Sequence, residues 1–464
     1  MLQKYFLLKT DKDALSYKCG ETMKLTVCAK VNPASEMSTY LRWDLRADDG
    51  TSSWGFGKVA PGRPLVLETK ISRPGFVHLH CTALNADMSE DLSFAKFDGG
   101  CGAEIEKLTY LDGEFSEQYD KYWAELEKLI DEYEYEIISC KPIEDERVPA
   151  THEAYDIQIS TPEDWRPCSA IVTIPKGKDN LPLTMSYIGY GVTPAFVQPD
   201  AGIRISVNAH GIENFKVRFD AQKKYEELNS YGINGEDINS PYTSYWRGMM
   251  IRDMIAVKYG KTLKQWDGKT LNFEGGSQGA FQATNMAAHT KGATFLTIGV
   301  PWYCNRKAEK EGYINGWGPR FEDGVRMFDT VAAGLRVKCP VTITAYLGDY
   351  TCPPHSVTAL YNSISTKKQL VFVQGGTHGY RHPEGEKFYR FFDPENPTGE
   401  IKKGKYLCEN GKEYTVTEVI KDFSTGENTV IFTDGENTYN CPEHFFKDMY
   451  YGKANLIERF KYLG

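Results

Sequence analysis

From about residue 135 to 393 the chain alternates short apolar runs with segments of helical spacing, and this alternation limits the possible folds most. Runs such as "SAIVTIP", "LTMSYIGYG" and "TLNFEGG" each end in glycine or proline, and "SYWRGMMIRDMIAVKY" between two of them has a helical pattern. Near-continuous apolar strands separated by helices are typical of a mainly parallel sheet covered by helices on both faces. In such sheets, sites form at the carboxyl ends of the strands.

The two ends of the chain show a different pattern. Residues 1 to about 105 hold short alternating runs such as "KLTVCAKV" and "GFVHLHCTAL", which predict a β-sandwich. The stretch "FDGGCGAE" then has the composition of a linker. Near the other end, β-type runs with Asn-Gly and Asp-Gly turns predict a small β-rich segment and a terminal helix. We therefore expect an N-terminal β-sandwich domain (1–105), an α/β domain (106–395) and a β-rich C-terminal segment (400–464).

An aromatic stripe predicts one further helix at the start of the α/β domain. Its side chains recur at steps of three and four residues: Phe115, Tyr119, Tyr122, Trp123, Leu126, Leu129, Ile130 and Tyr133. We expect this stripe to be a packing face rather than a ligand site.

Composition and charge exclude several functional classes. A formal net charge of −9 and an isoelectric point near 5.6 argue against nucleic acid or an anionic membrane as the main partner. No apolar run has the length of a membrane span, and the run "YFLL" is too short for the core of a signal peptide. The eleven cysteines include no C-x-x-C pair, so we expect buried, reduced thiols in a soluble, cytoplasmic protein.

The stretch "LNFEGGSQGAFQATNMAAH" contains the pattern G-x-S-x-G around Ser277. An apolar run precedes this serine and a helix-like segment follows it, as in a nucleophile elbow. Such a turn strains the backbone of the serine and leaves space only for very small residues two positions before and after it, here Gly275 and Gly279. The alternative is a glycine-rich turn around an idle serine.

A serine nucleophile needs a histidine base and an acid that orients the base, and in this fold the chain order is serine, acid, histidine. We predict His378 as the base, because it lies in a loop directly after the apolar run "QLVFV". The other histidines after Ser277 are His289, His355, His382 and His444. We predict Asp349 as the acid, because it follows the run "VTITAYLG", whereas Asp323 and Asp329 follow no apolar strand.

The elbow also predicts the groups that would stabilise an oxyanion and line a pocket. The backbone N–H of Gln278 comes directly after the serine, and the turn after "LTMSY" offers the N–H of Tyr190. Trp302 and Tyr303 follow another strand end and are candidates for a pocket wall, with a role as core aromatics equally compatible with the pattern. The spacing of His378 and His382 is that of a helical zinc site, but glycines and a proline around them argue against a helix, so we expect no metal and no cofactor.

These motifs together resemble the acetyl xylan esterase / cephalosporin C deacetylase family (carbohydrate esterase family seven). The resemblance covers roughly residues 115–393 and rests on "FSEQYDKYWAELEKL", "GYG", "GGSQGA", "PWYCNRKAE", "RVKCPVTITAYLGDYTCPP" and "YNSI". It implies an α/β-hydrolase core, a triad at Ser277, Asp349 and His378, and a ring-like homo-oligomer that is often a hexamer. The chain departs from the family at His210–Ile212, usually Arg-Gly-Gln, at Ile188–Tyr190, commonly His-Gly-Tyr, and at His378–Gly379, commonly His-Glu.

The expected function is a serine esterase that removes acetyl or other short acyl groups from carbohydrate hydroxyls, such as those of acetylated xylo-oligosaccharides. Two alternatives stay open at this point. The same triad would serve an amidase or peptidase, and the β-type segments would serve a carbohydrate-binding protein with an idle hydrolase core.

Overall fold

The computed structural model describes residues 5–30, 39–91, 96–214, 227–228, 231–233, 238–395, 397, 400–407, 412–421, 428–443 and 446. The chain divides into two compact units. The larger consists of Met1–Ser365 with Leu370–Tyr389, and the smaller of Thr366–Gln369 with Arg390–Gly464. The N-terminal segment and the α/β segment therefore lie in the same unit.

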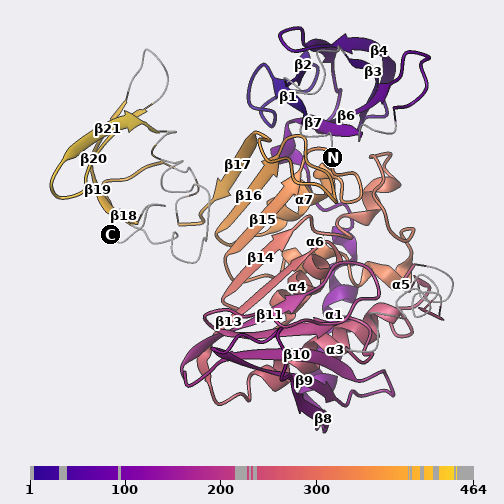
Figure 1. Ribbon diagram of the computed structural model, residues 1–464, viewed down its shortest axis with the longest axis vertical. Helices are drawn as coiled ribbons and strands as arrows, with labels where there is room; N and C mark the ends of the chain where they lie inside the picture. Colours follow the sequence, from indigo (N-terminus) through magenta and orange to yellow (C-terminus); the bar gives the residue numbers. More distant parts are fainter. Residues whose placement is uncertain are drawn as a thin grey trace. The chain divides into compact units, whose positions relative to one another are not determined.

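The central element is a ten-stranded sheet with the order β17-β16-β15-β14-β13-β11-β12-β10-β9-β8 (Figure 1). Its strands are β8 (Ile137–Pro142), β9 (His152–Ile159), β10 (Cys168–Pro175), β11 (Leu181–Tyr187), β12 (Ile203–Asn208), β13 (Trp266–Gly276), β14 (Phe295–Gly299), β15 (Val341–Tyr346), β16 (Lys368–Val373) and β17 (Lys387–Phe392). The sheet is mixed, because β8, β9, β10 and β12 pair antiparallel, whereas β12, β11, β13, β14 and β15 pair parallel. The apolar runs recognised in the sequence correspond to its central strands.

Helices connect the strands. They are α1 (Ser116–Glu132), α3 (Tyr245–Gly260), α4 (Gln278–His289), α5 (Asp323–Arg326), α6 (Thr330–Gly334) and α7 (Pro354–Ser363), with short 3₁₀ helices η2 (Ile105–Lys107), η3 (Gly113–Phe115) and η5 (Arg306–Glu309). The aromatic stripe on α1 is buried at Tyr119, Tyr122 and Trp123, and the indole N–H of Trp123 donates to the Met327 carbonyl at 2.8 Å. The stripe is therefore a packing face, as its spacing predicted.

The N-terminal segment forms two antiparallel sheets. One has the order β1-β2-β5 and the other β4-β3-β6-β7. Their strands are β1 (Phe6–Thr10), β2 (Met23–Ala29), β3 (Thr39–Ala47), β4 (Ser52–Val59), β5 (Leu65–Thr69), β6 (Gly75–Leu84) and β7 (Phe97–Ala103). Along β6, the side chains from Val77 to Leu84 alternate between buried and partly exposed, so one face of this strand packs inside and the other faces outward.

Strand β7 corrects one expectation, because the stretch "FDGGCGAE" is a strand and not a linker. Its glycines allow close backbone approach. A Cβ at Gly100 would lie 2.4 Å from the Val77 carbonyl oxygen and 3.1 Å from that of Leu347. Gly100 also exchanges two hydrogen bonds with the Gln374 side chain, its N–H donating at 3.0 Å and its carbonyl accepting at 2.7 Å. Glycine here allows the N-terminal sheet to dock on the loops of the large sheet.

The smaller unit contains a four-stranded antiparallel sheet in sequence order. Its strands are β18 (Gly404–Leu407), β19 (Glu413–Lys421), β20 (Asn428–Thr433) and β21 (Thr438–Pro442). Its core includes Val416, Val430 and Phe432, and the predicted Asp-Gly turn joins β20 to β21 at Asp434–Gly435. The terminal helix that we predicted lies outside the described residues.

None of the helices in the described part of the chain combines the length and the apolar character needed to cross a membrane.

Candidate active site

Ser277 lies between β13 and α4 with φ 56° and ψ −119°, a backbone conformation that non-glycine residues rarely adopt. Steric crowding explains why Gly275 and Gly279 are glycines. A Cβ at Gly275 would lie 2.3 Å from the backbone of Gly279, and a Cβ at Gly279 would lie 2.2 Å from the Tyr187 carbonyl oxygen. The third glycine, Gly276, is under no such constraint, because a Cβ there would meet only the Gly299 carbonyl oxygen at 3.9 Å.

Backbone hydrogen bonds hold this strained turn from both sides. The Ser277 N–H donates to the Gly299 carbonyl at 2.9 Å, which ties the turn to the neighbouring strand β14. The Ser277 carbonyl accepts from Ala280 at 3.0 Å and from Phe281 at 3.1 Å, which starts helix α4. The strain is therefore offset by one bond to the neighbouring strand and by the bonds of the first turn of α4.

The structure brings the three residues of the predicted triad together. The His378 Nε2 atom lies 2.9 Å from Ser277 Oγ, and its Nδ1 atom lies 2.9 Å from Asp349 Oδ2. Ser277 follows β13 and Asp349 follows β15, and both strands belong to the parallel part of the sheet. The carboxyl ends of these strands therefore meet at one edge, where the loop after β16 brings His378.

The carboxylate of Asp349 is held in one orientation. Its side chain is 1% exposed, and its Oδ1 atom accepts the backbone N–H groups of Thr351 and Cys352, both at 3.0 Å. The second oxygen, Oδ2, is left to face His378. This arrangement selects the tautomer of His378 that carries its proton on Nδ1 and offers the lone pair of Nε2 to the serine.

The rival histidines have other partners. His289 is stacked on Trp123 with ring centroids 3.9 Å apart. The Nε2 atom of His355 lies 3.0 Å from the Ile314 carbonyl, and that of His382 lies 2.9 Å from the Phe6 carbonyl. His444 lies outside the described residues. Each described alternative base therefore supports the fold away from Ser277.

The rival acids also have structural roles. Asp329 is buried and caps helix α6 by accepting the N–H of Val331 at 2.8 Å, and it also accepts from Asn305 and Arg306. Burial raises the pKa of Asp329 to about 6. Asp323 is exposed and pairs with Arg326 at 3.0 Å.

The two predicted oxyanion donors come from loops that lie against each other. Gln278 is the first residue of α4, where backbone N–H groups have no partner within the helix. A Cβ at Gly189, next to Tyr190, would lie 3.9 Å from the Ser277 Cβ. The hydroxyl of Tyr231 joins these loops, since it accepts the Gly191 N–H at 2.9 Å and donates to Gln278 Oε1 at 3.1 Å.

His210 supports the same loop from the position where the resembled family has arginine. Its Nε2 atom lies 2.9 Å from the Gly191 carbonyl, and its Nδ1 atom lies 2.8 Å from the Tyr245 hydroxyl. Burial lowers the pKa of His210 to about 3. The ring is therefore neutral, donates from Nε2 to the carbonyl and accepts from the tyrosine.

The aromatic residues near the site divide into a core group and an exposed one. Trp302 and Tyr303, predicted as pocket wall, are 1% and 3% exposed and pack against Trp246. Trp317 is 42% exposed. Its ring lies edge-on to that of Tyr190, with ring centroids 4.5 Å apart, and its backbone N–H donates to the Thr351 carbonyl at 3.0 Å. This exposed indole lies between the Tyr190 turn and the Asp349 loop.

The site also contains one possible set of metal-ligating atoms. Asp349, Cys352 and His378 each place a ligand atom within 4.8 Å of the others. However, both carboxylate oxygens of Asp349 already have partners in the loop and in His378, so the donor set fits a hydrogen-bonded acid and base. His382 does not share this set, because its Nε2 atom faces Phe6.

Comparison with known proteins connects this site to one family. The model of the acetyl xylan esterase (AXE1) family matches residues 323–393, a range that contains Asp349 and His378. Acetyl esterase Axe7A of Xylanibacter ruminicola is 24% identical over 268 residues, which are 52% of this chain and 58% of that protein. The chain is similar to the acetyl xylan esterases over these ranges. The resemblance predicted from the sequence is thus confirmed.

Solved structures of acetyl xylan esterases are also similar to this chain. One from Paenibacillus sp. R4 is 16% identical with a TM-score of 0.48, over 59% of this chain and 93% of its own. Acetyl xylan esterase 1 from Thermoanaerobacterium sp. JW/SL YS485 is 18% identical with a TM-score of 0.43, over 57% of this chain and 90% of its own.

Three residues around the candidate site could not be recognised from the sequence pattern. Tyr231 lies in the polar stretch "LNSYGING" and Trp317 in "INGWGPR", where neither strand nor helix spacing marks them. Gln374 ends the run "QLVFVQ", where a polar residue after a strand is ordinary. Its structural role comes from its hydrogen bonds with Gly100, which lies 274 positions away along the chain.

Proposed function

We propose that the chain is a serine carboxylesterase that removes acetyl groups from carbohydrate hydroxyls. One observation carries the proposal: Ser277 Oγ, the His378 ring and the Asp349 carboxylate form a continuous hydrogen-bonded chain at a strained elbow. The kinship with acetyl xylan esterases supports the ester substrate and the α/β-hydrolase assignment of the core. The parallel strands that end at the elbow fit that assignment.

In the proposed reaction, Ser277 Oγ attacks the acetyl carbonyl carbon while His378 Nε2 accepts the serine proton. The backbone N–H groups of Tyr190 and Gln278 receive the negative charge that develops on the carbonyl oxygen. The tetrahedral intermediate collapses, and the sugar oxygen leaves with the proton held by His378. Water then repeats the sequence on the acetyl-enzyme, releases acetate and regenerates the serine.

The acid contributes by orientation and charge rather than by proton transfer. Asp349 accepts the Nδ1–H of His378 and stabilises the imidazolium that forms during attack. The exposed indole of Trp317, beside the Tyr190 turn, offers an apolar face on which the ring of the sugar would rest. Trp302 is buried behind this turn, so in this proposal it supports the wall and does not touch the sugar.

A labelling experiment and a substrate panel test the proposal together. A fluorophosphonate should label the protein at one site per chain, and Ser277→Ala should abolish both labelling and hydrolysis of aryl acetates. Loss of the nucleophile should reduce the rate by about 10⁴- to 10⁶-fold. The exposed Ser365 provides the control, and Ser365→Ala should leave both signals unchanged.

The panel compares an aryl acetate, an aryl butyrate, an aminoacyl anilide and an acetylated xylo-oligosaccharide. We expect the acetate to exceed the butyrate and acetate to be released from the oligosaccharide. Preference for the anilide would replace the esterase by an amidase or peptidase. Absence of labelling in folded protein would instead favour a carbohydrate-binding protein.

A further inference from the structure

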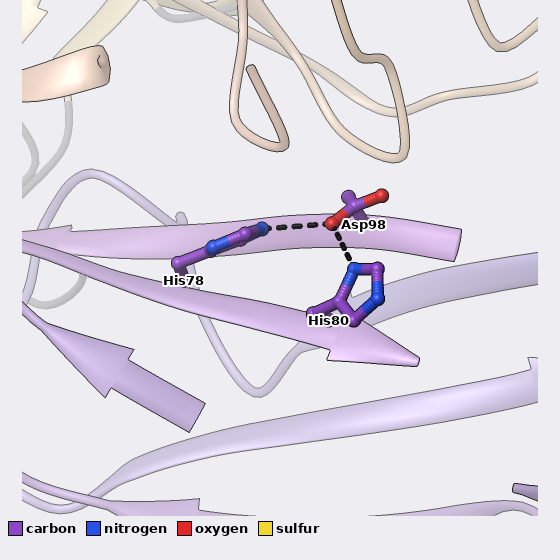
Figure 2. A group of neighbouring side chains, drawn as sticks. All are labelled: His78, His80 and Asp98. Carbon is purple, nitrogen blue, oxygen red and sulfur yellow. Dashed lines mark hydrogen bonds and ion pairs between the residues drawn. The ribbon is translucent and has the colours of Figure 1, made fainter. Parts of the chain in front are cut away.

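Two histidines and an aspartate gather on the partly exposed face of strands β6 and β7 (Figure 2). His78 and His80 are two residues apart on β6, so their side chains lie on the same face of the strand. Asp98 on β7 lies directly across from His80 in the antiparallel register. Sequence spacing on one strand and pairing with the next therefore place the three side chains together.

The ligand-type atoms of these residues converge. The Asp98 Oδ1 atom lies 2.9 Å from His78 Nε2 and 2.6 Å from His80 Nδ1, and each residue has a ligand atom within 4.8 Å of those of the other two. Figure 2 shows both rings turned toward the same carboxylate oxygen. We propose that His78, His80 and Asp98 bind a divalent transition-metal ion of the zinc type.

The donor set suits such an ion. Two imidazole nitrogens and one carboxylate oxygen are ligands of zinc sites with an open position, where zinc–ligand bonds are about 2.0–2.2 Å and the geometry is tetrahedral. Donor atoms around such an ion stand roughly 3.3 Å apart. The two observed N···O distances are shorter, at 2.9 and 2.6 Å, so small side-chain rotations would open the space.

The second nitrogen of one ligand ring also has a partner. The His80 Nε2 atom faces Thr82 Oγ1 at 3.4 Å. Metal-binding histidines usually donate their other N–H to such an outer group, which holds the ring in its binding orientation. The hydroxyl of Thr82 is therefore placed to support coordination through Nδ1.

The surroundings leave the remaining coordination position open. His78 and His80 line a hollow of about 580 Å³ on this face of the sheet, which has space for water or a small ligand on the ion. Two ion pairs also line this hollow beside the histidines. Arg42 pairs with Asp44 at 3.2 Å and Lys96 pairs with Glu90 at 3.5 Å, so the charges within each pair cancel.

One cation opposes the metal. Arg46 on β3 is the cross-strand partner of His78 and lines the same hollow. Its charge should weaken metal binding without preventing it, because the Asp98 carboxylate would contact the ion directly as a ligand. The arginine therefore supplies a variant that should strengthen binding.

The position of the cluster gives the ion a structural consequence. The His78 ring stacks on Tyr350 with centroids 3.8 Å apart and planes 21° from parallel, and Tyr350 follows the proposed acid Asp349 in the chain. A Cβ at Gly348 would lie only 2.7 Å from the Asp98 Cβ. An ion held by these residues would therefore fasten the N-terminal sheet to the acid loop.

The test measures metal binding directly on the full chain, so it does not depend on the proposed esterase activity. Protein stripped with a chelator is titrated with Zn²⁺ by calorimetry and with Co²⁺ by visible absorption. We expect one ion per chain. Asp98→Asn and His80→Gln should each weaken binding by more than about 100-fold, because loss of even an outer-shell partner costs 10- to 100-fold.

Two further variants keep the test decisive if a ligand variant folds poorly. Arg46→Gln should tighten Zn²⁺ binding by about threefold or more, since it removes a nearby positive charge. The control is His152→Gln. This histidine lies on β9 and not in the cluster, so its replacement should leave the affinity for Zn²⁺ unchanged. Thermal melts with and without Zn²⁺ should show a rise in Tm for the wild type and for His152→Gln.

The proposal is overturned if no stoichiometric Zn²⁺ or Co²⁺ binding occurs. It is also overturned if the affinity is the same in the wild type, in Asp98→Asn, in His80→Gln and in Arg46→Gln. In that case the cluster is a pair of imidazole N–H groups donating to one carboxylate. If the wild-type protein binds the metal but shows no esterase activity, that result would count against the proposed function and not against the metal site.

Discussion

The proposed nucleophile and its proposed acid–base partners are held in place in different ways. Ser277 is positioned mainly by residues close to it in the chain, namely the glycines at 275 and 279, the strand before it and the helix after it, with one further hydrogen bond to Gly299 of β14. Asp349 and His378 lie on loops that contact the N-terminal sheet, through the Gln374–Gly100 hydrogen bonds and the His78–Tyr350 stack. A nucleophile can therefore be recognised from a short motif, whereas the support of its partners depends on distant residues.

If this contrast is right, adding a single methyl group beside Ser277 should give the largest loss of activity. Gly275→Ala would place a Cβ 2.3 Å from the Gly279 backbone, which has no room to move away. We expect loss of activity by about 10³-fold or more and destabilisation by about 1–3 kcal/mol. Gly276→Ala is the matched control, because its Cβ would meet nothing closer than 3.9 Å. Similar kinetics and denaturant midpoints for the two variants would contradict the steric explanation.

On the acid–base side, the expected largest effect comes from a residue that touches no substrate. Gln374→Leu would leave the N–H and the carbonyl of Gly100 without their partner in a buried place. We expect a loss of about 2–4 kcal/mol in the free energy of unfolding, measured by urea denaturation, together with a fall in kcat. Gln158→Leu on β9, far along the sheet, should change neither. An unchanged kcat in stable Gln374→Leu protein would show that the N-terminal sheet does not support these loops.

A pH experiment examines the packing between helix α3 and helix α4, which follows the proposed nucleophile. Asp253 on α3 is fully buried, its carboxylate faces Gln282 of α4 at 2.8 Å, and burial raises its pKa to about 8. The folded state therefore keeps a proton that the unfolded state loses near its ordinary pKa of 3.8. The free energy of unfolding should fall by up to about 1.4 kcal/mol per pH unit as the pH rises through this window.

Asp253→Asn removes the titrating group and should abolish this part of the pH dependence. Urea denaturation of wild type and variant at several pH values between the two pKa values measures the difference. Parallel stability curves would show that Asp253 is charged in the folded protein.

The smallest expected effect concerns the connection between the Tyr190 turn and the start of helix α4, which carry the proposed oxyanion donors. Tyr231→Phe removes the hydroxyl that joins the Gly191 N–H to Gln278 Oε1. A loss of about 1 kcal/mol should lower kcat roughly five- to tenfold with little change in KM. Tyr133→Phe, which removes a hydroxyl bonded to Ser160, is the control. A change confined to KM would assign Tyr231 to substrate binding rather than to positioning of the loop.

Much of the central sheet followed from the sequence because apolar runs and glycine stops mark its strands. The elbow followed from G-x-S-x-G, and the strand ends indicated Asp349 and His378. The support of these residues did not follow, because the relevant contacts are long-range. Tyr231 reaches Gln278 across 47 positions, and no periodicity links such residues.

Strand β7 shows why one local prediction was wrong. Glycine-rich stretches usually lack the side chains that a strand needs, so "FDGGCGAE" has the composition of a flexible linker. In the fold, the glycines serve close approach between backbones, as Gly100 does against Val77 and Leu347. That use of glycine depends on what lies opposite, which the local sequence does not contain.

The glycines of β7 also bear on how this protein can be divided. Because Gly100 and the Gln374 side chain bond each other directly, a cut near residue 105 would remove half of a junction that reaches the loop of the proposed base. The α/β segment therefore could not be moved to another protein alone, because strand β7, which bonds to it, would have to be moved with it.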